Sequence, residues 1–413
     1  MINSEEFPQH LLKQPWVKRL EFFQQCRIIH KRMETISDEI MSAIRQRAGE
    51  GFIFVVGPTR IGKTTVLEYV VNKKLEESMD DILKNPGCIP VARMETRPYH
   101  RGYDWKDHWA GCLEAISEPL IDRKIEQRTH EYEAERNIRD FLREGKTTRI
   151  LRRAFEKGAK MRELEVFCVD EAQHLTLVPY SKMYRAQLEI IKSVASQSKA
   201  MHVLFGTYDV LKLRNASGQL GSRAVTKHFS RYKPDSKTDV KEFAKAVLNL
   251  TVLMPLREPP ELKKEDLEYC FDTCLGCVGL LKVWFTDTLG AVLENGEKTL
   301  TREHLEKNEP PLDVLDKISS EIVYGEKMLE QDETKRTLIR LRMLQGGKYK
   351  EPELLEQPPV ERQDGLKNQA ESSQKTDATA QASKRKRGTK KGRRVERKPK
   401  RDRVSGGRRQ RAA

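Results

Sequence analysis

The sequence predicts an α/β fold in which a parallel β-sheet is flanked by helices and followed by a small helical lid and a disordered basic tail. Between residues 51 and 255, short apolar runs typical of buried strands alternate with helical stretches. This alternation favours a parallel sheet covered by helices. Residues 256–345 carry helical patterns alone, and few apolar residues follow them. We therefore expect a helical N-terminal lead-in (1–50), the sheet core (51–255), a helical lid (256–345), a disordered linker (346–383) and a basic tail (384–413).

The N-terminal lead-in is expected to be helical and amphipathic. Its apolar residues recur at the spacing that places side chains along one stripe of a helix. These residues are Trp16, Leu20, Phe22, Phe23, Ile28, Ile29, Met33, Ile36 and Ile40.

The first predicted strand ends in a phosphate-binding loop. An apolar run over residues 52–56 precedes the sequence GPTRIGKTT, which has the spacing G-x-x-x-x-G-K-[ST] and continues into a helical run. Glycines let backbone N–H groups surround a phosphate chain, and the following helix adds its positive N-terminal end. Lys63 should reach the β- and γ-phosphates, and the Thr64 hydroxyl should ligate Mg²⁺. The predicted nucleotide-binding residues are Gly57, Pro58, Thr59, Arg60, Ile61, Gly62, Lys63, Thr64 and Thr65.

A second apolar run, residues 166–169, ends in two adjacent acidic residues, Asp170 and Glu171. On their own these would most often be solvated acids at the end of a strand. Together with the phosphate loop they predict hydrolysis, with Asp170 holding Mg²⁺ through its water shell and Glu171 acting as the base on the attacking water. A third run, residues 203–205, ends in Gly206 and Thr207, and the Thr207 hydroxyl is placed to sense the γ-phosphate.

The lid contains three of the seven cysteines, Cys270, Cys274 and Cys277. A zinc site would need a further ligand, and neither a second C-x-x-C pair nor a close histidine supplies one. We therefore favour small apolar packing residues over a metal site. The scattered cysteines suit a reducing, cytoplasmic setting, and neither a secretory signal nor a membrane-spanning apolar run is predicted.

The net charge of +15 is concentrated at the C-terminus. Residues 384–411 carry sixteen Lys and Arg against two acidic residues, so residues 1–383 are nearly neutral. Residues 351–383 have too few apolar side chains to offset the entropy lost on ordering, which predicts disorder. The tail has three other interpretations, as a solubilising segment, a nuclear-import signal or a peptide that docks on an acidic partner. We favour binding to nucleic acid, since such a run condenses on phosphates.

Two basic features inside the core are candidate DNA contacts. One is a loop that mixes basic and aromatic residues, and the other is a helix with a cationic face. A solvated surface is the alternative in both cases. The candidates are Arg97, Arg101, Lys106, Thr147, Arg149, Arg152 and Arg153.

With these motifs, the chain resembles the transposon-encoded AAA+ ATPase regulators of the TnsC/TniB type. The resemblance covers roughly residues 10–330. It is carried by the stretches GPTRIGKTT, VFCVDEAQHL, LFGTYDVL, GQLGSRAVTKHFSRY and GCVGLLKVWF. Gln173 and His174 are its most specific part, because a general ATPase does not need them.

The resemblance implies a bacterial, DNA-associated AAA+ P-loop ATPase that uses ATP and Mg²⁺. It would assemble with itself on double-stranded DNA, as a ring or helical filament, link a target-selection protein to a transposase, and disassemble on hydrolysis. An arginine from the neighbouring subunit would complete each ATP site, with Arg223 as first choice and Arg231 as second. Lys282 stands where the lid of such proteins commonly has an arginine. It is a further candidate contact to the γ-phosphate, although lysine lacks the bidentate fork of arginine.

Two alternatives remain. An initiator or helicase-loader ATPase would share this chemistry but usually carries a winged-helix domain after the lid, and residues 346–413 are too polar for one. A DNA-bound adaptor that uses ATP only as an assembly ligand would not need Glu171 or Arg223. The resemblance favours the transposition regulator.

Overall fold

The computed structural model describes residues 7–46, 51–98, 103–121, 139–177, 182–215, 224–330, 337, 339–341, 343 and 344, with the backbone alone for 139–146 and 182–188. The chain divides into two compact units, Met1–Asp332 and Glu333–Ala413. In the second unit only short helical pieces between 337 and 344 are described. The predicted disordered linker and basic tail lie outside the described residues.

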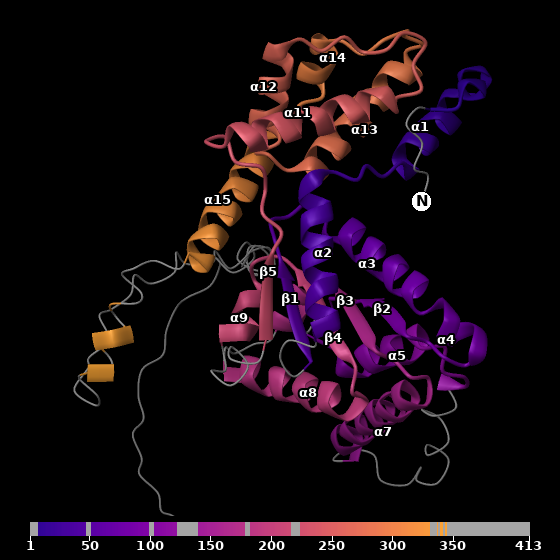
Figure 1. The fold of residues 1–413 in the computed structure, drawn as a ribbon, viewed down its shortest axis with the longest axis vertical. Coiled ribbons are helices and arrows are strands. Elements are labelled where there is room, and N and C mark those ends of the chain that lie inside the picture. The colour runs from indigo at the N-terminus through magenta and orange to yellow at the C-terminus, as the bar shows by residue number, and fades with distance from the viewer. Residues whose placement is uncertain are drawn as a thin grey trace, which may run out of the picture. The chain divides into compact units, whose positions relative to one another are not determined.

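Five strands form one sheet in the first unit (Figure 1). Their order is β2-β3-β4-β1-β5 and every pair is parallel, which confirms the predicted parallel sheet. The register pairs Val56 with Gly206 and Glu95 with Asp170, so the residues that follow β1, β3 and β4 meet at one edge. The strands are β1 (Phe52–Val56), β2 (Val91–Glu95), β3 (Val166–Asp170), β4 (Met201–Gly206) and β5 (Ala224–His228).

Alternate residues of the central strands enter two separate apolar cores. Ile53 and Phe205 pack with α2 and α3, whereas Phe54 and Leu204 pack with α5, α7, α8 and α9. Coverage on both faces explains why these strands are continuously apolar. The helices are α2 (Lys31–Gln46), α3 (Lys63–Glu77), the short α4 (Met79–Lys84), α5 (Trp105–Ala115), α7 (Arg139–Met161), α8 (Lys182–Ser198) and α9 (Val210–Asn215).

The described residues of the N-terminal segment form helices that pack on two different parts of the unit. A short 3₁₀ helix η1 (Gln9–Lys13) precedes α1 (Trp16–Gln25). α1 contacts α13 of the lid, while α2 contacts α3 and β5 of the sheet domain. The link between α1 and α2 therefore joins the lid to the sheet domain.

The lid is a group of helices that packs into the same apolar core as α2 and α3. Trp284 and Phe285 lie at its centre and are 0–1% exposed. α11 contacts α12 and α13, although its residues fall within the predicted sheet core. The lid helices are α11 (Lys237–Val252), α12 (Lys264–Thr273), α13 (Val278–Glu294) and α14 (Arg302–Lys307).

A final helix, α15 (Leu312–Leu329), follows Pro310 and Pro311 and packs back against the sheet domain. Gly325 lies against the ring of Tyr208, which follows β4. A Cβ atom at Gly325 would come within 2.1 Å of that ring, so the close approach requires glycine. One residue further along α15, Glu326 forms an ion pair with Arg231, with 3.2 Å between Oε1 and Nε.

Cys270, Cys274 and Cys277 are fully buried in this core and have free thiols. The described residues contain no group of three or more His, Cys, Asp or Glu that could hold a metal ion. In the described part of the chain, no helix is by itself long and apolar enough to cross a membrane; α12 and α13 meet that criterion only as a pair bent by 110°.

Candidate nucleotide-binding site

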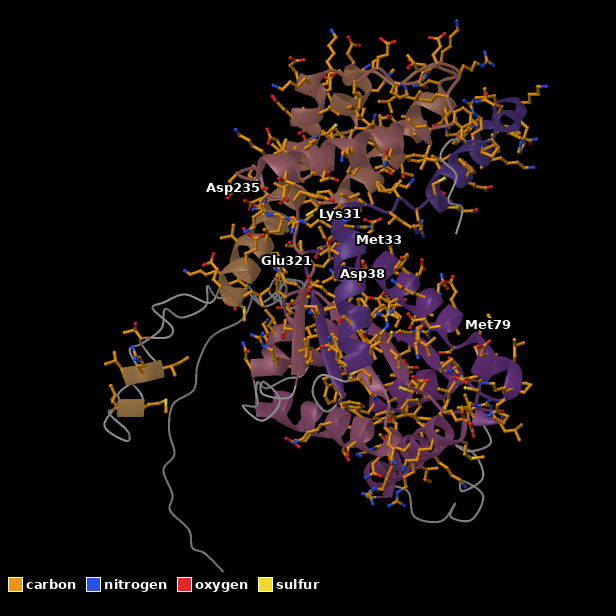
Figure 2. All side chains as sticks on the ribbon, in the orientation of Figure 1. Lys31, Met33, Asp38, Met79, Asp235 and Glu321 are labelled. Atoms are coloured by element: carbon orange, nitrogen blue, oxygen red, sulfur yellow. The ribbon has the colours of Figure 1, made fainter. Side chains whose placement is uncertain are left out.

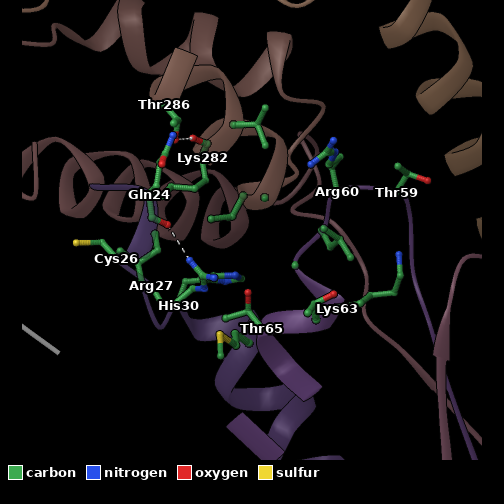
Figure 3. A pocket seen from close by; sticks show the side chains of 18 of the residues that line it. Gln24, Cys26, Arg27, His30, Thr59, Arg60, Lys63, Thr65, Lys282 and Thr286 are labelled. Carbon is green, nitrogen blue, oxygen red and sulfur yellow. Dashed lines mark hydrogen bonds between the residues drawn. The ribbon is translucent and has the colours of Figure 1, made fainter. Parts of the chain in front are cut away.

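A cavity of about 590 Å³ lies where three segments of the first unit meet. The phosphate loop, the link between α1 and α2, and the first half of α13 line it (Figure 3). Glu171, Gln173 and Thr207, which follow β3 and β4, complete the lining. The three motifs found in the sequence are therefore brought to one site, at the edge where parallel strands end.

The backbone of the phosphate loop depends on its glycines. Gly62, directly before α3, has φ of 109°, in the left-handed region that favours glycine. A Cβ atom at Gly57 would lie 2.5 Å from the carbonyl oxygen of Phe229. The G-x-x-x-x-G spacing thus serves both the turn and the close approach of β5.

Lys63 lies inside this loop and is 7% exposed. Its Nζ donates to the carbonyl oxygens of Pro58 (2.8 Å) and Gly57 (3.1 Å). Burial lowers its pKa, while Glu321, Glu171 and Asp170 oppose that shift. Among the described residues, its hydrogen bonds go to these two carbonyl oxygens, which the ammonium is well placed to exchange for phosphate oxygens.

Thr64 and Asp170 are joined directly across 106 residues of sequence. The Thr64 hydroxyl donates to Asp170 Oδ2 at 2.8 Å. Burial raises the pKa of Asp170, and the hydrogen bonds from Thr64 and from the Glu171 backbone N–H oppose the rise. A hydroxyl oxygen beside a carboxylate is the hard donor set that Mg²⁺ prefers, so these residues fit the predicted metal site.

Glu171 is held beside this pair in an unusual backbone conformation. Its φ is 51°, and its N–H donates to Asp170 Oδ1 at 2.9 Å. The side-chain amide of Gln173 donates to Glu171 Oε2 and accepts from the Thr207 backbone N–H at 3.2 Å. Thr207 lines the cavity, and its contact with the γ-phosphate stays a prediction.

The link between α1 and α2 supplies a wall that the sequence did not predict. His30 is stacked on Phe229 at 15° with 6.2 Å between the ring centroids, and its Nδ1 is 3.0 Å from the Tyr232 hydroxyl. Burial lowers the pKa of His30 to about 4, so the imidazole is neutral at pH 7. With Ile28 and Met33 it forms a surface suited to a flat, uncharged ring such as a nucleobase.

The lid reaches the cavity through the start of α13. A Cβ atom at Gly279 would lie 2.2 Å from the carbonyl oxygen of Arg60, so the lid packs directly on the phosphate loop there. Lys282, one turn further, also lines the cavity. Its Nζ donates to the carbonyl oxygen of Phe23 and lies 3.2 Å from the centroid of the Phe23 ring. In this structure Lys282 therefore binds α1, rather than pointing a free ammonium at the phosphate loop.

α15 also contacts the phosphate loop, which no sequence motif indicated. Glu321, labelled in Figure 2, accepts from the Thr59 hydroxyl at 2.7 Å and from the Thr59 backbone N–H at 3.2 Å. This contact places a carboxylate on the loop that the sequence predicts to bind phosphates.

Of the two arginines predicted to complete the ATP site of a neighbouring subunit, the structure describes only one. Arg223 lies outside the described residues. Arg231 is half-buried and forms its ion pair with Glu326 of the same chain. Arg231 would have to leave Glu326 before it could serve a neighbouring subunit.

The candidate DNA contacts are only partly grouped on exposed surface. Arg149 and Arg153 are exposed on α7, and Arg97 is exposed after β2. Arg152 is turned inward, where it pairs with Glu156 (2.8 Å) and donates to Ser193 of α8 (2.6 Å). Thr147 and Lys106 are half-buried, and Arg101 lies outside the described residues.

Comparisons with known proteins support the nucleotide-binding fold. Residues 45–213 match the AAA domain family. With the five-stranded parallel sheet and its phosphate loop, this match gives the unit the fold of an AAA+ P-loop nucleoside triphosphatase, as the sequence predicted.

No curated protein matches this chain. Among solved structures, the ORC2 protein of Aeropyrum pernix in ADPNP and ADP complexes is similar at 14% identity and a TM-score of 0.44, covering 70% of each chain. The ORC1 protein of the same organism in complex with DNA is similar at 15% identity and a TM-score of 0.45, covering 84% of this chain and 78% of that one. A Walker-type ATPase of Pyrococcus abyssi is similar at 16% identity and a TM-score of 0.43, covering 77% of this chain and 81% of that one. Overlaps this distant carry no functional argument.

Proposed function

We propose that this chain is a Mg²⁺-dependent ATPase whose active site is the cavity described above. The observation that carries the proposal is the direct contact between Thr64 and Asp170, with Lys63 and Glu171 in the same site. In a P-loop enzyme, these four groups supply the metal ligands, the phosphate-binding ammonium and the base. The choice of ATP over other nucleotides rests on the family resemblance.

Each residue then has a distinct role in hydrolysis. Lys63 leaves the carbonyl groups of Pro58 and Gly57 for the β- and γ-phosphate oxygens. Thr64 and Asp170 would hold Mg²⁺, which would supply neutralisation of the charge on the phosphates. Glu171 accepts a proton from the attacking water, and Thr207 contacts the γ-phosphate. The neighbouring subunit would supply Arg223.

Phosphate release by the purified protein tests this proposal. We expect turnover that requires Mg²⁺ and falls by about 10²–10⁴-fold in Glu171→Gln, because that change removes the base. Lys63→Ala should also lose nucleotide binding, while Lys84→Ala, at an exposed position of α4, should behave as wild type. A wild-type protein that binds ATP without releasing phosphate would reject hydrolysis and favour the adaptor.

We further propose that the ATPase regulates DNA transposition in a bacterial cytoplasm. In this role, ATP binding assembles the chain on double-stranded DNA, where it links a target-selection protein to a transposase, and hydrolysis releases it. The family resemblance supports this role, and the exposed Arg97, Arg149 and Arg153 offer cations for DNA phosphates. We leave Arg152 out of this set because it is paired inside the unit.

Electron microscopy of the protein with double-stranded DNA and a slowly hydrolysed ATP analogue tests this assembly. Rings or filaments that disappear in Lys63→Ala would support it. Monomers that bind DNA only through the tail, and lose binding when the chain is shortened after Ser383, would reject it. The alternative of an initiator or helicase loader would be favoured if assemblies load a helicase but do not stimulate a transposase.

A further inference from the structure

Gln173 connects the predicted catalytic base to the end of the neighbouring strand. Its side-chain N–H donates to Glu171 Oε2, and its side-chain oxygen accepts from the Thr207 backbone N–H at 3.2 Å. Glu171 follows β3 and Thr207 follows β4. One amide thus links two of the residues assigned to hydrolysis.

The chemistry of this link requires glutamine. The group that faces Glu171 must donate, because a carboxylate only accepts, and the group that faces the Thr207 N–H must accept. A glutamate at position 173 could serve Thr207 but not Glu171, and an asparagine would be one methylene short.

The surroundings hold the amide in place. A Cβ atom at Gly206 would lie 2.7 Å from Gln173 Oε1 and 3.2 Å from the Gln173 backbone nitrogen, so the glycine makes room for it. The backbone of Glu171 is fixed from the other side by its hydrogen bond to Asp170 Oδ1.

The same contacts distinguish the two oxygens of Glu171. The Gln173 amide binds Oε2, and His174 Nε2 lies 4.0 Å from that same oxygen. Among the described residues, none donates a hydrogen bond to Oε1. The carboxylate is therefore oriented with one oxygen occupied and the other available for a water molecule.

We propose that Gln173 is a positioning residue for ATP hydrolysis: it fixes the Glu171 carboxylate so that Oε1 faces the attacking water, and it ties that orientation to the γ-phosphate contact at Thr207. This inference rests on the proposed ATPase function. Gln173 acts through Glu171 and does not itself take the proton.

Steady-state kinetics of Gln173→Met tests the proposal, because methionine preserves the length and packing of the side chain but makes neither hydrogen bond. We expect kcat to fall about 10–100-fold, less than the loss from removing the base itself. KM and the affinity for a fluorescent ATP analogue should change by less than about 3-fold. The variant keeps the contacts that bind the nucleotide equally in the ground state and the transition state. Gln46→Met, at an exposed position of α2, is the matched control and should retain wild-type turnover.

Gln173→Glu supplies a readout that a packing role would not move. A glutamate has the size of glutamine and can still accept from the Thr207 backbone N–H, but it cannot donate to the Glu171 carboxylate. We therefore expect kcat to fall at least as far as in Gln173→Met, with KM again changed by less than about 3-fold. A role in packing alone would leave kcat unchanged.

Two results would overturn the inference, and they are distinguishable. Wild-type kcat in both Gln173→Met and Gln173→Glu would reject the positioning role while the ATPase stands. An absence of phosphate release from the wild-type protein would reject the ATPase and this role together.

Discussion

Two walls of the nucleotide cavity are built in different ways. The strand-end wall consists of Lys63 and Thr64, at the start of α3, and of Asp170, Glu171 and Thr207, which lie at or directly after the ends of β3 and β4. The helical wall is formed by α13 and the link between α1 and α2, and α15 contacts the phosphate loop beside it; all three approach the loop from distant parts of the chain. Under the proposed function, the first wall carries the groups that hydrolysis needs, whereas the second packs helical segments against the phosphate loop. Changes in the two walls should therefore separate turnover from affinity.

The largest effect is expected in the strand-end wall. Thr64→Val preserves the shape of the side chain but removes the metal-ligating hydroxyl and its bond to Asp170. Turnover should fall by about 10²–10³-fold, because metal stabilisation of phosphate charge is worth several kcal/mol. Phosphate release over a Mg²⁺ titration measures this. Thr35→Val, at an exposed position of α2, is the matched control, and equal losses in both variants would show that the hydroxyl at 64 has no special role.

In the helical wall, Gly279→Ala should disturb the packing of the lid on the phosphate loop. The added methyl group would lie 2.2 Å from the carbonyl oxygen of Arg60, which is backbone and cannot move aside cheaply. Such overpacking costs about 1–3 kcal/mol, which predicts roughly a 10-fold loss of ATP affinity. Gly290→Ala on the same helix meets only Leu20 at 3.4 Å and should bind ATP normally. Equal affinities would contradict direct packing of the lid on the loop.

Glu321→Gln should act in the opposite direction. The single amide oxygen can keep only one of the two hydrogen bonds from Thr59, and the negative charge near the phosphate loop is removed. We expect ATP affinity to rise about 5-fold, corresponding to roughly 1 kcal/mol of relieved repulsion. Asp316→Asn, at an exposed position of α15, controls for the general loss of one acid. A fluorescent analogue titrated at low salt gives both affinities, and a fall in Glu321→Gln would indicate that α15 supports binding instead.

The smallest effect concerns Lys282. Burial, with a contribution from Arg27, lowers its pKa from 10.5 to about 7 in the folded protein. The unfolded chain therefore holds more protons between pH 7 and 10.5, and the free energy of unfolding should rise with pH in that window. Lys282→Met should lose part of this rise, while Lys264→Met, at an exposed lysine of α12, should retain it. Urea unfolding at pH 7 and pH 9.5 provides the comparison.

The strand-end wall could be predicted from the sequence because each of its parts is a contiguous motif. The spacing of GPTRIGKTT and the acids after 166–169 identify their roles locally, and parallel strands bring them to one edge. The helical wall gave no such signal. Glu321 and Thr59 are 262 residues apart, and Phe23 and Lys282 are 259 apart. No local pattern specifies either contact. The family resemblance made Lys282 a candidate contact to the γ-phosphate, whereas the structure pairs it with Phe23.

The position of α15 has a practical consequence for anyone who shortens this chain. A truncated protein would omit the polar segment after the lid, and Pro310 and Pro311, which separate α14 from α15, are a natural end point for it. A protein that ends there would lose the acidic partner of Thr59, the partner of Arg231 and the backbone that covers Tyr208. A protein that ends after Glu330 keeps all three. The phosphate loop of the protein that ends at Pro311 would therefore lack a contact that it has in the full chain, and measurements on that protein would not apply to the full chain.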